Sequence, residues 1–145
     1  MQEFEYLGQI FLAVILGGIL GWQRERWGKS AGPRTYALVT AGSALFTLLS
    51  IHAFSGSDPS RVASQIITGI GFLGAGTILH REQRVEGLTT AAGLWATAAI
   101  GMTVGVSFYI LAVSATILML TILILHENKL KQQFRHNGSS ETEKL

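Results

Sequence analysis

The stretch that decides the fold is residues 88–125, LTTAAGLWATAAIGMTVGVSFYILAVSATILMLTILIL, which contains no Asp, Glu, Lys or Arg. A single helix of these 38 residues would be about 57 Å long, whereas the hydrocarbon core of a bilayer is roughly 30 Å thick. We therefore expect two membrane-spanning helices in this stretch, separated by a break near Gly105, Val106 and Ser107.

Three further stretches lack charged residues and have about the length of one span each: 7–22, 35–54 and 62–79. Charged residues make up 14% of the chain, against roughly 25% in soluble domains. A soluble helix bundle would need charges on the outer face of every helix, and these stretches have none. The sequence thus predicts an all-α integral membrane protein with five transmembrane helices. Residues 1–125 form the transmembrane domain and 126–145 a short cytoplasmic tail.

The distribution of basic residues predicts the orientation. With five spans, all the Lys and Arg residues but Arg61 fall on the side of the C-terminal tail. Cytoplasmic loops carry an excess of Lys and Arg, so we expect the amino terminus outside and the tail inside. Glu3 and Glu5 at the amino terminus are opposite to the charge of a secretory signal, so the first segment is expected to remain as a helix. The aromatic residues near the span ends are expected to anchor at the two membrane surfaces; they are Tyr6, Trp22, Trp27, Tyr36 and Tyr109.

Several classes of function lack the residues that they need. The chain has no cysteine, which excludes disulfides and zinc–thiolate sites, and it has no P-loop, HExxH or GxSxG motif. We therefore expect no enzyme activity. The net charge of +2 follows from topology and gives no reason to expect nucleic acid. None of the predicted spans carries a carboxylate at mid-membrane, where an ion pathway would place one. Since Mg²⁺ is usually held by carboxylates, a magnesium path within one chain has little support, and we expect no metal site and no cofactor.

Small residues predict the helix contacts, because backbones in lipid approach closely where side chains are small. Gly17 and Gly21 form a GxxxG pair, and Gly93, Gly101 and Gly105 share one face with two threonines. The third charge-free stretch contains a denser cluster, made of Gly69, Gly71, Gly74 and Gly76. We expect the first, third and fourth helices at the core and the glycine-free fifth helix at the periphery. The cluster has two interpretations: tight packing, within one chain or in a homodimer, or a broken helix that lines a cavity.

Polar side chains gather at the predicted cytoplasmic ends of the helices: Arg24, Glu25, Arg34, Thr35, Thr89 and Thr90. One interpretation is a basic anchor with a weak surface ion pair. The other is a functional cluster that closes over the third and fourth helices. The sequence leaves both open.

At the opposite surface, Asp58 followed by Pro59 is typical of a helix start, with aspartate at the N-cap and proline at the first helical position. The functional alternative is an outward-facing charge pair of Asp58 and Arg61, with Gln65 one turn deeper. His52 lies nearby, but one histidine and one carboxylate are too few for a metal site.

These motifs together resemble the membrane domain of the MgtC/SapB family. The matching segments are 17–26 (GGILGWQRER), 31–39 (AGPRTYALV), 58–61 (DPSR) with Gln65, 69–76 (GIGFLGAG) and 85–95 (VEGLTTAAGLW). Gln23, Pro33 and Tyr36 depart from the family pattern, which more often has Glu, Leu and His. The resemblance therefore carries no cation-binding role to the cytoplasmic cluster. Many members continue into a soluble domain, and we expect this chain to correspond to the transmembrane domain alone.

The resemblance implies a multi-pass protein of the bacterial inner membrane that takes part in magnesium homeostasis and growth at low magnesium. Some members of the family are also linked to survival inside host cells. The resemblance implies that the protein is a regulator, which binds other membrane proteins including the ATP synthase, rather than a carrier that moves magnesium itself. The small-residue stripes agree with partners in the bilayer, either another membrane protein or a second copy. The alternative is a transporter or channel for Mg²⁺, another cation or a small solute.

Overall fold

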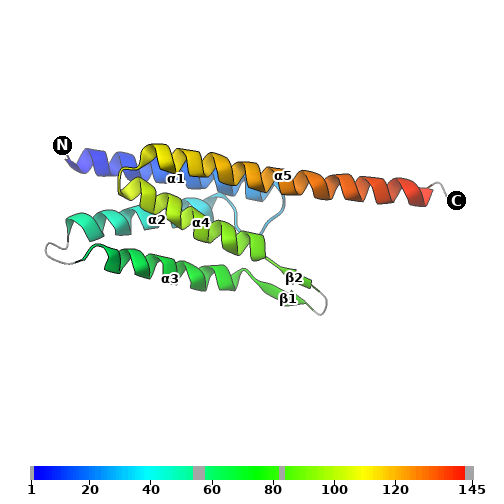
Figure 1. Cartoon of the computed structure of the whole chain (residues 1–145), viewed down its shortest axis with the longest axis horizontal. Coiled ribbons are helices and arrows are strands. Elements are labelled where there is room, and N and C mark those ends of the chain that lie inside the picture. Colours follow the sequence, from blue (N-terminus) through cyan, green and yellow to red (C-terminus); the bar gives the residue numbers. More distant parts are fainter. Residues whose placement is uncertain (1, 54–57, 82–83, 143–145) are drawn as a thin grey trace.

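The computed structural model describes residues 2–53, 58–81 and 84–142, with side chains described as far as Leu125 except that of Arg81. Five helices account for most of this part of the chain: α1 (Gln2–Arg26), α2 (Pro33–His52), α3 (Ser60–Gly76), α4 (Leu88–Gly105) and α5 (Tyr109–Thr142). They lie side by side and run alternately in opposite directions, so that the amino terminus and the C-terminus are at opposite ends (Figure 1). The mostly helical fold is as predicted.

A short hairpin joins α3 to α4, which the sequence did not predict. Strands β1 (Leu79–Arg81) and β2 (Arg84–Glu86) pair antiparallel, with His80 opposite Val85. Gly87 follows with a φ of 89°, a left-handed conformation that favours glycine. A side chain at this position would collide with the Thr77 carbonyl at the end of α3. The hairpin therefore returns the chain directly against the helix that it left.

The break between the last two helices falls where the sequence placed it, at Gly105, Val106 and Ser107. α4 ends at Gly105 and α5 begins at Tyr109. Ser107 adopts a φ of 63°, and the Phe108 backbone N–H donates to the Thr103 carbonyl at 2.8 Å. This tight turn makes α4 and α5 antiparallel neighbours. α5 continues to Thr142, so the helix covers most of the predicted tail, whose last three residues lie outside the described part.

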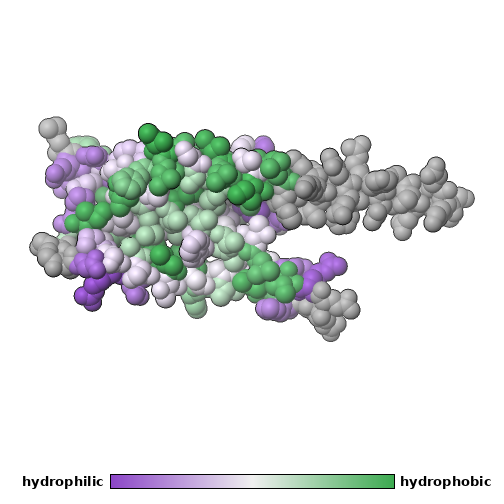
Figure 2. All heavy atoms as spheres, viewed as in Figure 1, coloured by the Kyte–Doolittle hydropathy of each residue, from purple (hydrophilic) through white to green (hydrophobic). Residues whose placement is uncertain are grey.

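Three helices, α1, α2 and α4, have the length and composition to cross a membrane, and the part of α5 from Tyr109 to Leu125 is a shorter apolar helix. Apolar side chains cover the middle of the outer surface, and polar ones gather toward its ends (Figure 2). Large apolar side chains are exposed: Phe4, Phe72 and Ile110 are each at least 80% exposed. Such a surface suits a lipid environment, since lipid rather than water solvates apolar side chains there.

The core lies between α1, α2 and α4, which corrects the prediction that the third helix is central. α3 lies at the edge of the bundle, with Ile66, Ile70 and Gly74 as its buried residues. α2 takes the central place, and two of its buried hydroxyl groups are satisfied within the helix: Thr40 donates to the Tyr36 carbonyl and Thr47 to the Ser43 carbonyl. The prediction missed α2 because hydroxyl residues carry its contacts and glycines do not. α5 lies at the periphery, as expected.

Candidate functional site

A buried arginine marks the junction of the three central helices at the hairpin end of the bundle. Arg24 lies in the last turn of α1 and is 2% exposed. Its Nη2 donates to Thr90 Oγ1 at 3.3 Å, and Thr90, in the first turn of α4, is buried too. A cation in the last turn also interacts favourably with the partial negative charge at the C-terminal end of its helix. The contact joins residues 66 positions apart in the sequence.

Gly28 turns the chain so that α2 packs beside Arg24. It adopts a φ of 63°, and the Lys29 backbone N–H donates to the Arg24 carbonyl at 3.1 Å. This αL turn closes α1 and lets α2 run back along it. The two helices touch at glycines: a methyl group at Gly17 would collide with Thr40 Oγ1, and one at Gly21 would meet the Gly32 carbonyl.

Tyr36 is the α2 residue that completes the junction. Its side chain is fully buried, which corrects the prediction that it anchors at the membrane surface. The ring lies over Gly93 of α4, where an added methyl group would come within 2.5 Å of the hydroxyl oxygen. The hydroxyl interacts electrostatically with Arg24. Further along the same contact, Gly101 packs on the Thr40 carbonyl and Gly105 on the Thr47 side chain.

The structure brings together two of the six polar residues predicted as a cytoplasmic cluster. Arg24 and Thr90 meet in the interior, whereas the other four side chains are exposed at the same end of the bundle: Glu25, Arg34, Thr35 and Thr89. Nearby, the Arg26 guanidinium stacks 3.9 Å from the centroid of the exposed Trp22 ring. The site is therefore a buried guanidinium within a polar rim.

The opposite end of the bundle holds the second predicted group, at the start of α3. Asp58 is exposed and accepts hydrogen bonds from the backbone N–H and the hydroxyl of Ser60, at 2.8 and 2.7 Å. These bonds, the hydroxyl first, hold the pKa of Asp58 below its usual value. The prediction placed Asp58 at the N-cap and Pro59 at the first helical position, whereas the structure has Pro59 at the N-cap and begins α3 at Ser60. Asp58 lies one residue further out and binds the Ser60 N–H from there. Arg61 and Gln65 follow at successive turns, both exposed, and have no side-chain hydrogen bond or ion pair with the residues that the structure describes.

Sequence reasoning missed one polar group of this end. Gln9 of α1 is 3% exposed, and its amide nitrogen donates to Ser107 Oγ at 2.7 Å and to the Tyr109 hydroxyl at 2.9 Å. The amide thus fastens α1 to the turn between α4 and α5. A lone amide in a charge-free stretch was the available indication, because such a group must find partners in lipid.

The glycines of α3 behave differently from those of α1 and α4. Gly74 packs against Ala91, with an added methyl group 3.5 Å from the Ala91 Cβ. Gly69, Gly71 and Gly76 are exposed and would have open space around a Cβ. α3 is nevertheless unbroken from Ser60 to Gly76, which contradicts the broken-helix interpretation. The other interpretation, that the cluster packs tightly within the chain, is wrong for these three glycines.

The chemistry available to the Arg24 junction is that of a fixed positive charge. A guanidinium stays protonated and donates to acceptors such as carboxylates and phosphates, so it neither carries protons nor binds cations. No group of three or more His, Cys, Asp or Glu side chains that could hold a metal ion occurs in the described part of the chain. His52 contacts the Tyr6 ring, with 4.9 Å between centroids.

The comparison with protein families finds a known family, because the MgtC family model matches residues 10–132, which include all of α2 and α4 and most of α1. The chain belongs to the MgtC family. The family resemblance of the sequence motifs is thereby confirmed.

Two relatives of this MgtC family member are longer than the chain itself. The chain is 44% identical over 132 residues to the Escherichia coli K12 protein named "Putative magnesium transporter YhiD", covering 85% of this chain and 61% of that one. It is 40% identical over 144 residues to "Protein MgtC" of Salmonella paratyphi A, covering 99% and 62%. The chain thus spans about three fifths of the length of these relatives. No solved structure matches it.

Proposed function

We propose that this MgtC family member is a multi-pass protein of the bacterial inner membrane that serves magnesium homeostasis and adaptation to low magnesium. It acts by binding other membrane proteins. In this proposal all five helices cross the bilayer, with the amino terminus outside and the hairpin end in the cytoplasm. The support is the alternating direction of the helices and the basic residues of the hairpin end, such as Arg24, Arg34 and Arg84.

The interior of the bundle favours regulation over transport. Mg²⁺ is bound by oxygen ligands, mainly carboxylates with retained waters. The side chain at the junction of α1, α2 and α4 is instead the Arg24 guanidinium, whose charge repels a passing cation in a medium of low dielectric constant. A resident cofactor or an enzymatic reaction has no place in this proposal.

The single observation that carries the regulator proposal is a face of α3 with small, exposed side chains. Ser64, Thr68, Gly71 and Ala75 are all exposed and follow one another at spacings of four, three and four residues. This spacing puts them on one side of the helix, which we call the small face of α3. Small residues allow a second transmembrane helix to approach closely, and lipid gives no reason to place them there. We assign this face to a partner helix.

Cross-linking in membranes tests the proposal. Because the sequence contains no cysteine, an introduced cysteine is the only thiol of the chain that can react. An Ala75→Cys variant, expressed in cells grown at low magnesium, should form a thiol-specific cross-link to another membrane protein, identified by mass spectrometry. Adding Gly71→Leu should reduce the adduct at least tenfold, because the longer side chain keeps the partner helix away.

Gly69→Leu is the matched control, since it makes the same change on the same helix but outside the small face. It should leave the adduct unchanged. Equal adduct yields from the Gly71→Leu variant and its parent, or no adduct from a well-folded protein, would refute the assignment of the partner to this face.

The alternative is a carrier or channel for Mg²⁺ or another cation, and the name of the Escherichia coli relative gives it weight. Its candidate residues in this chain are Asp58 and Gln65, near the outer end of α3. Magnesium flux into liposomes that contain the purified protein decides between the two. We expect no flux above protein-free liposomes; flux that Asp58→Ala abolishes, with folding intact, would establish the transporter instead.

A further inference from the structure

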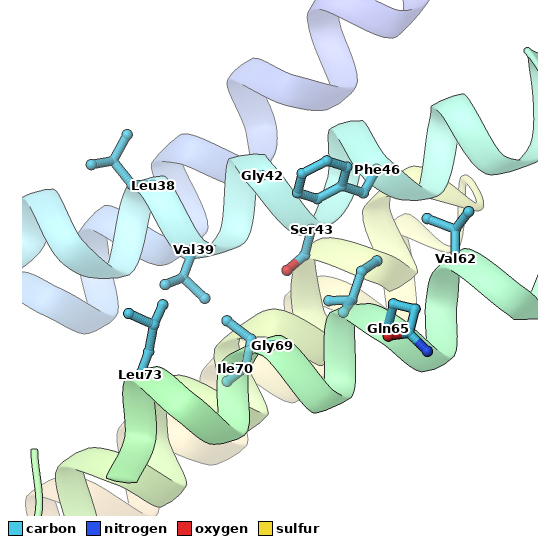
Figure 3. Close-up of a pocket in the computed structure, with 11 residues that line it drawn as sticks. Leu38, Val39, Gly42, Ser43, Phe46, Val62, Gln65, Gly69, Ile70 and Leu73 are labelled. Atoms are coloured by element: carbon cyan, nitrogen blue, oxygen red, sulfur yellow. The ribbon is translucent and has the colours of Figure 1, made fainter. Parts of the chain in front are cut away.

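An apolar groove runs between α2 and α3, away from the small face. It has a volume of about 540 Å³ and is lined by eleven residues, of which Ser43 and Gln65 are polar. Gly42 and Gly69 leave the space open, because neither would meet another atom within 4 Å if it carried a Cβ. The groove lies along the outer side of the bundle, with Leu38 and Leu73 at one end and Phe46 and Val62 at the other (Figure 3).

Two polar side chains of the groove make no hydrogen bond within the part of the chain that the structure describes. The Ser43 side chain is 3% exposed, and its hydroxyl points toward α3 across the groove (Figure 3). Neither this hydroxyl nor the Gln65 amide makes a hydrogen bond with the described residues. Buried polar groups are costly when unpaired, most of all where lipid replaces water. The groove therefore calls for an occupant that has a long apolar part and hydrogen-bonding groups at one end.

Three of the α3 residues that line the groove follow one another at intervals of four, Gln65, Gly69 and Leu73. Arg61 does not line the groove and lies four residues before Gln65. This spacing places a cation, an amide, an open space and an apolar side chain successively along one side of the helix. From Gln65 to Leu73 the distance along the axis is about 12 Å, close to half of the roughly 30 Å hydrocarbon core. Arg61 lies a further 6 Å or about one turn outward, at the depth of the headgroups.

This order matches the chemistry of one phospholipid. We propose that the groove binds a phospholipid of the leaflet at the Arg61 end. One acyl chain lies over Gly69 and Gly42, the ester groups accept hydrogen bonds from Gln65 and Ser43, and the phosphate pairs with Arg61. Charge complementarity supports the assignment. The Asp58 carboxylate accepts hydrogen bonds from Ser60 and interacts electrostatically with Arg61, but the Arg61 guanidinium makes no ion pair within the described residues that would keep it from a phosphate.

The proposal goes beyond the regulatory role and uses a different side of α3. The two sides can therefore be tested separately. Gly69→Leu fills the groove without touching the small face, whereas Gly71→Leu blocks the small face without touching the groove. Failure of lipid binding would leave the partner cross-link unaffected, and the reverse holds as well.

Native mass spectrometry of the full chain provides the test. The protein is released from detergent after incubation with dioleoyl phosphatidylglycerol, and the fraction that retains one lipid is measured over a lipid titration. We expect saturable retention of one lipid. Gly69→Leu should weaken it at least tenfold, Arg61→Gln and Gln65→Leu each about threefold to tenfold, and Gly71→Leu not at all.

Each other result overturns the proposal. Equal retention by Gly69→Leu and the parent chain would place the lipid elsewhere. Equal retention of dioleoylglycerol, which lacks the phosphate, would remove the role of Arg61. A chain-to-chain dimer that excludes lipid and disappears in Gly69→Leu would make the occupant a second copy. If Gly69→Leu does not fold, as judged by circular dichroism, the exposed Arg61→Gln and Gln65→Leu variants carry the test.

Discussion

Glycine has opposite roles in α4 and in α3. Gly101 and Gly105 of α4 are buried against the α2 backbone and side chains, whereas Gly69 and Gly71 of α3 border open space. The first pair joins two helices of one chain, and the second pair leaves room for something outside it. A glycine stripe in a membrane helix thus indicates close approach without saying whether the approaching group belongs to the same chain.

The largest effect should come from filling the closed contact. Gly101→Leu would drive a side chain into the Thr40 carbonyl, which is part of the central helix and cannot move aside. We expect a loss of about 3 kcal/mol or more in the free energy of unfolding, or no folded protein at all. Gly71→Leu should stay within about 0.5 kcal/mol of the parent chain, as surface substitutions do. Unfolding in detergent, followed by circular dichroism, measures both; equal effects would erase the distinction between the two regions.

Removing the buried charge should have the next largest effect. Arg24→Ala leaves the Thr90 hydroxyl without its donor and opens a space at the three-helix junction. The expected cost is about 2 kcal/mol, within the range for an unsatisfied buried group. Thr90→Val, which removes the acceptor, should cost less when combined with Arg24→Ala than when made alone. Strict additivity in this double-mutant cycle would show that the bond contributes nothing.

A smaller effect is expected at the other end of the central helices. Gln9→Leu removes the donor for Ser107 and Tyr109 and should reduce stability by about 1 kcal/mol. Since the amide holds α1 to the α4–α5 turn, hydrogen exchange should rise in residues 105–109 more than in α3. Uniform exchange across the bundle would contradict a local fastening role.

The smallest effect should be the pH dependence that Asp58 confers at the start of α3. Its pKa is lower in the folded protein than in the unfolded chain, so its contribution is present above the unfolded pKa. The contribution is lost as the pH falls through the folded pKa. Asp58→Asn should flatten the stability curve in that acidic range and leave the slope near neutral pH unchanged. An unchanged acidic slope would mean that the Ser60 hydrogen bonds are not formed in solution.

The elements of this fold are readable from the sequence because lipid imposes a simple rule. Long charge-free stretches need hydrogen-bonded backbones, and helices supply them, so the five helices and the break at residues 105–107 follow from length alone. The arrangement of the helices does not follow in the same way. α2 is central through Tyr36, Thr40 and Thr47, which with Ser43 follow at spacings of four, three and four and so lie on one side of the helix. The prediction overlooked them because it counted only glycines as contact residues. α3 was placed at the core because glycine was taken to mean contact within the chain.

The candidate site was predictable in part. Arg24 and Thr90 were both named from the sequence, but their neighbours Thr89 and Glu25 are exposed, and only the rotation of each helix decides which side chain points inward. Tyr36 shows the same difficulty: a tyrosine at a helix start suits the membrane surface equally well. The α2–α3 groove has no sequence pattern of its own, because its two walls come from helices whose relative distance is set elsewhere.

The close contact between Gly87 and Thr77 has a mechanical consequence for α3. At the hairpin end, the backbone of α3 is fixed against the start of α4, with no side chain between them to yield. At the other end, α3 is tied to α2 through the hydrogen bond from Ser50 to the Pro59 carbonyl. α3 is therefore held at both of its ends, and these two attachments set its spacing from α2 along the groove between them.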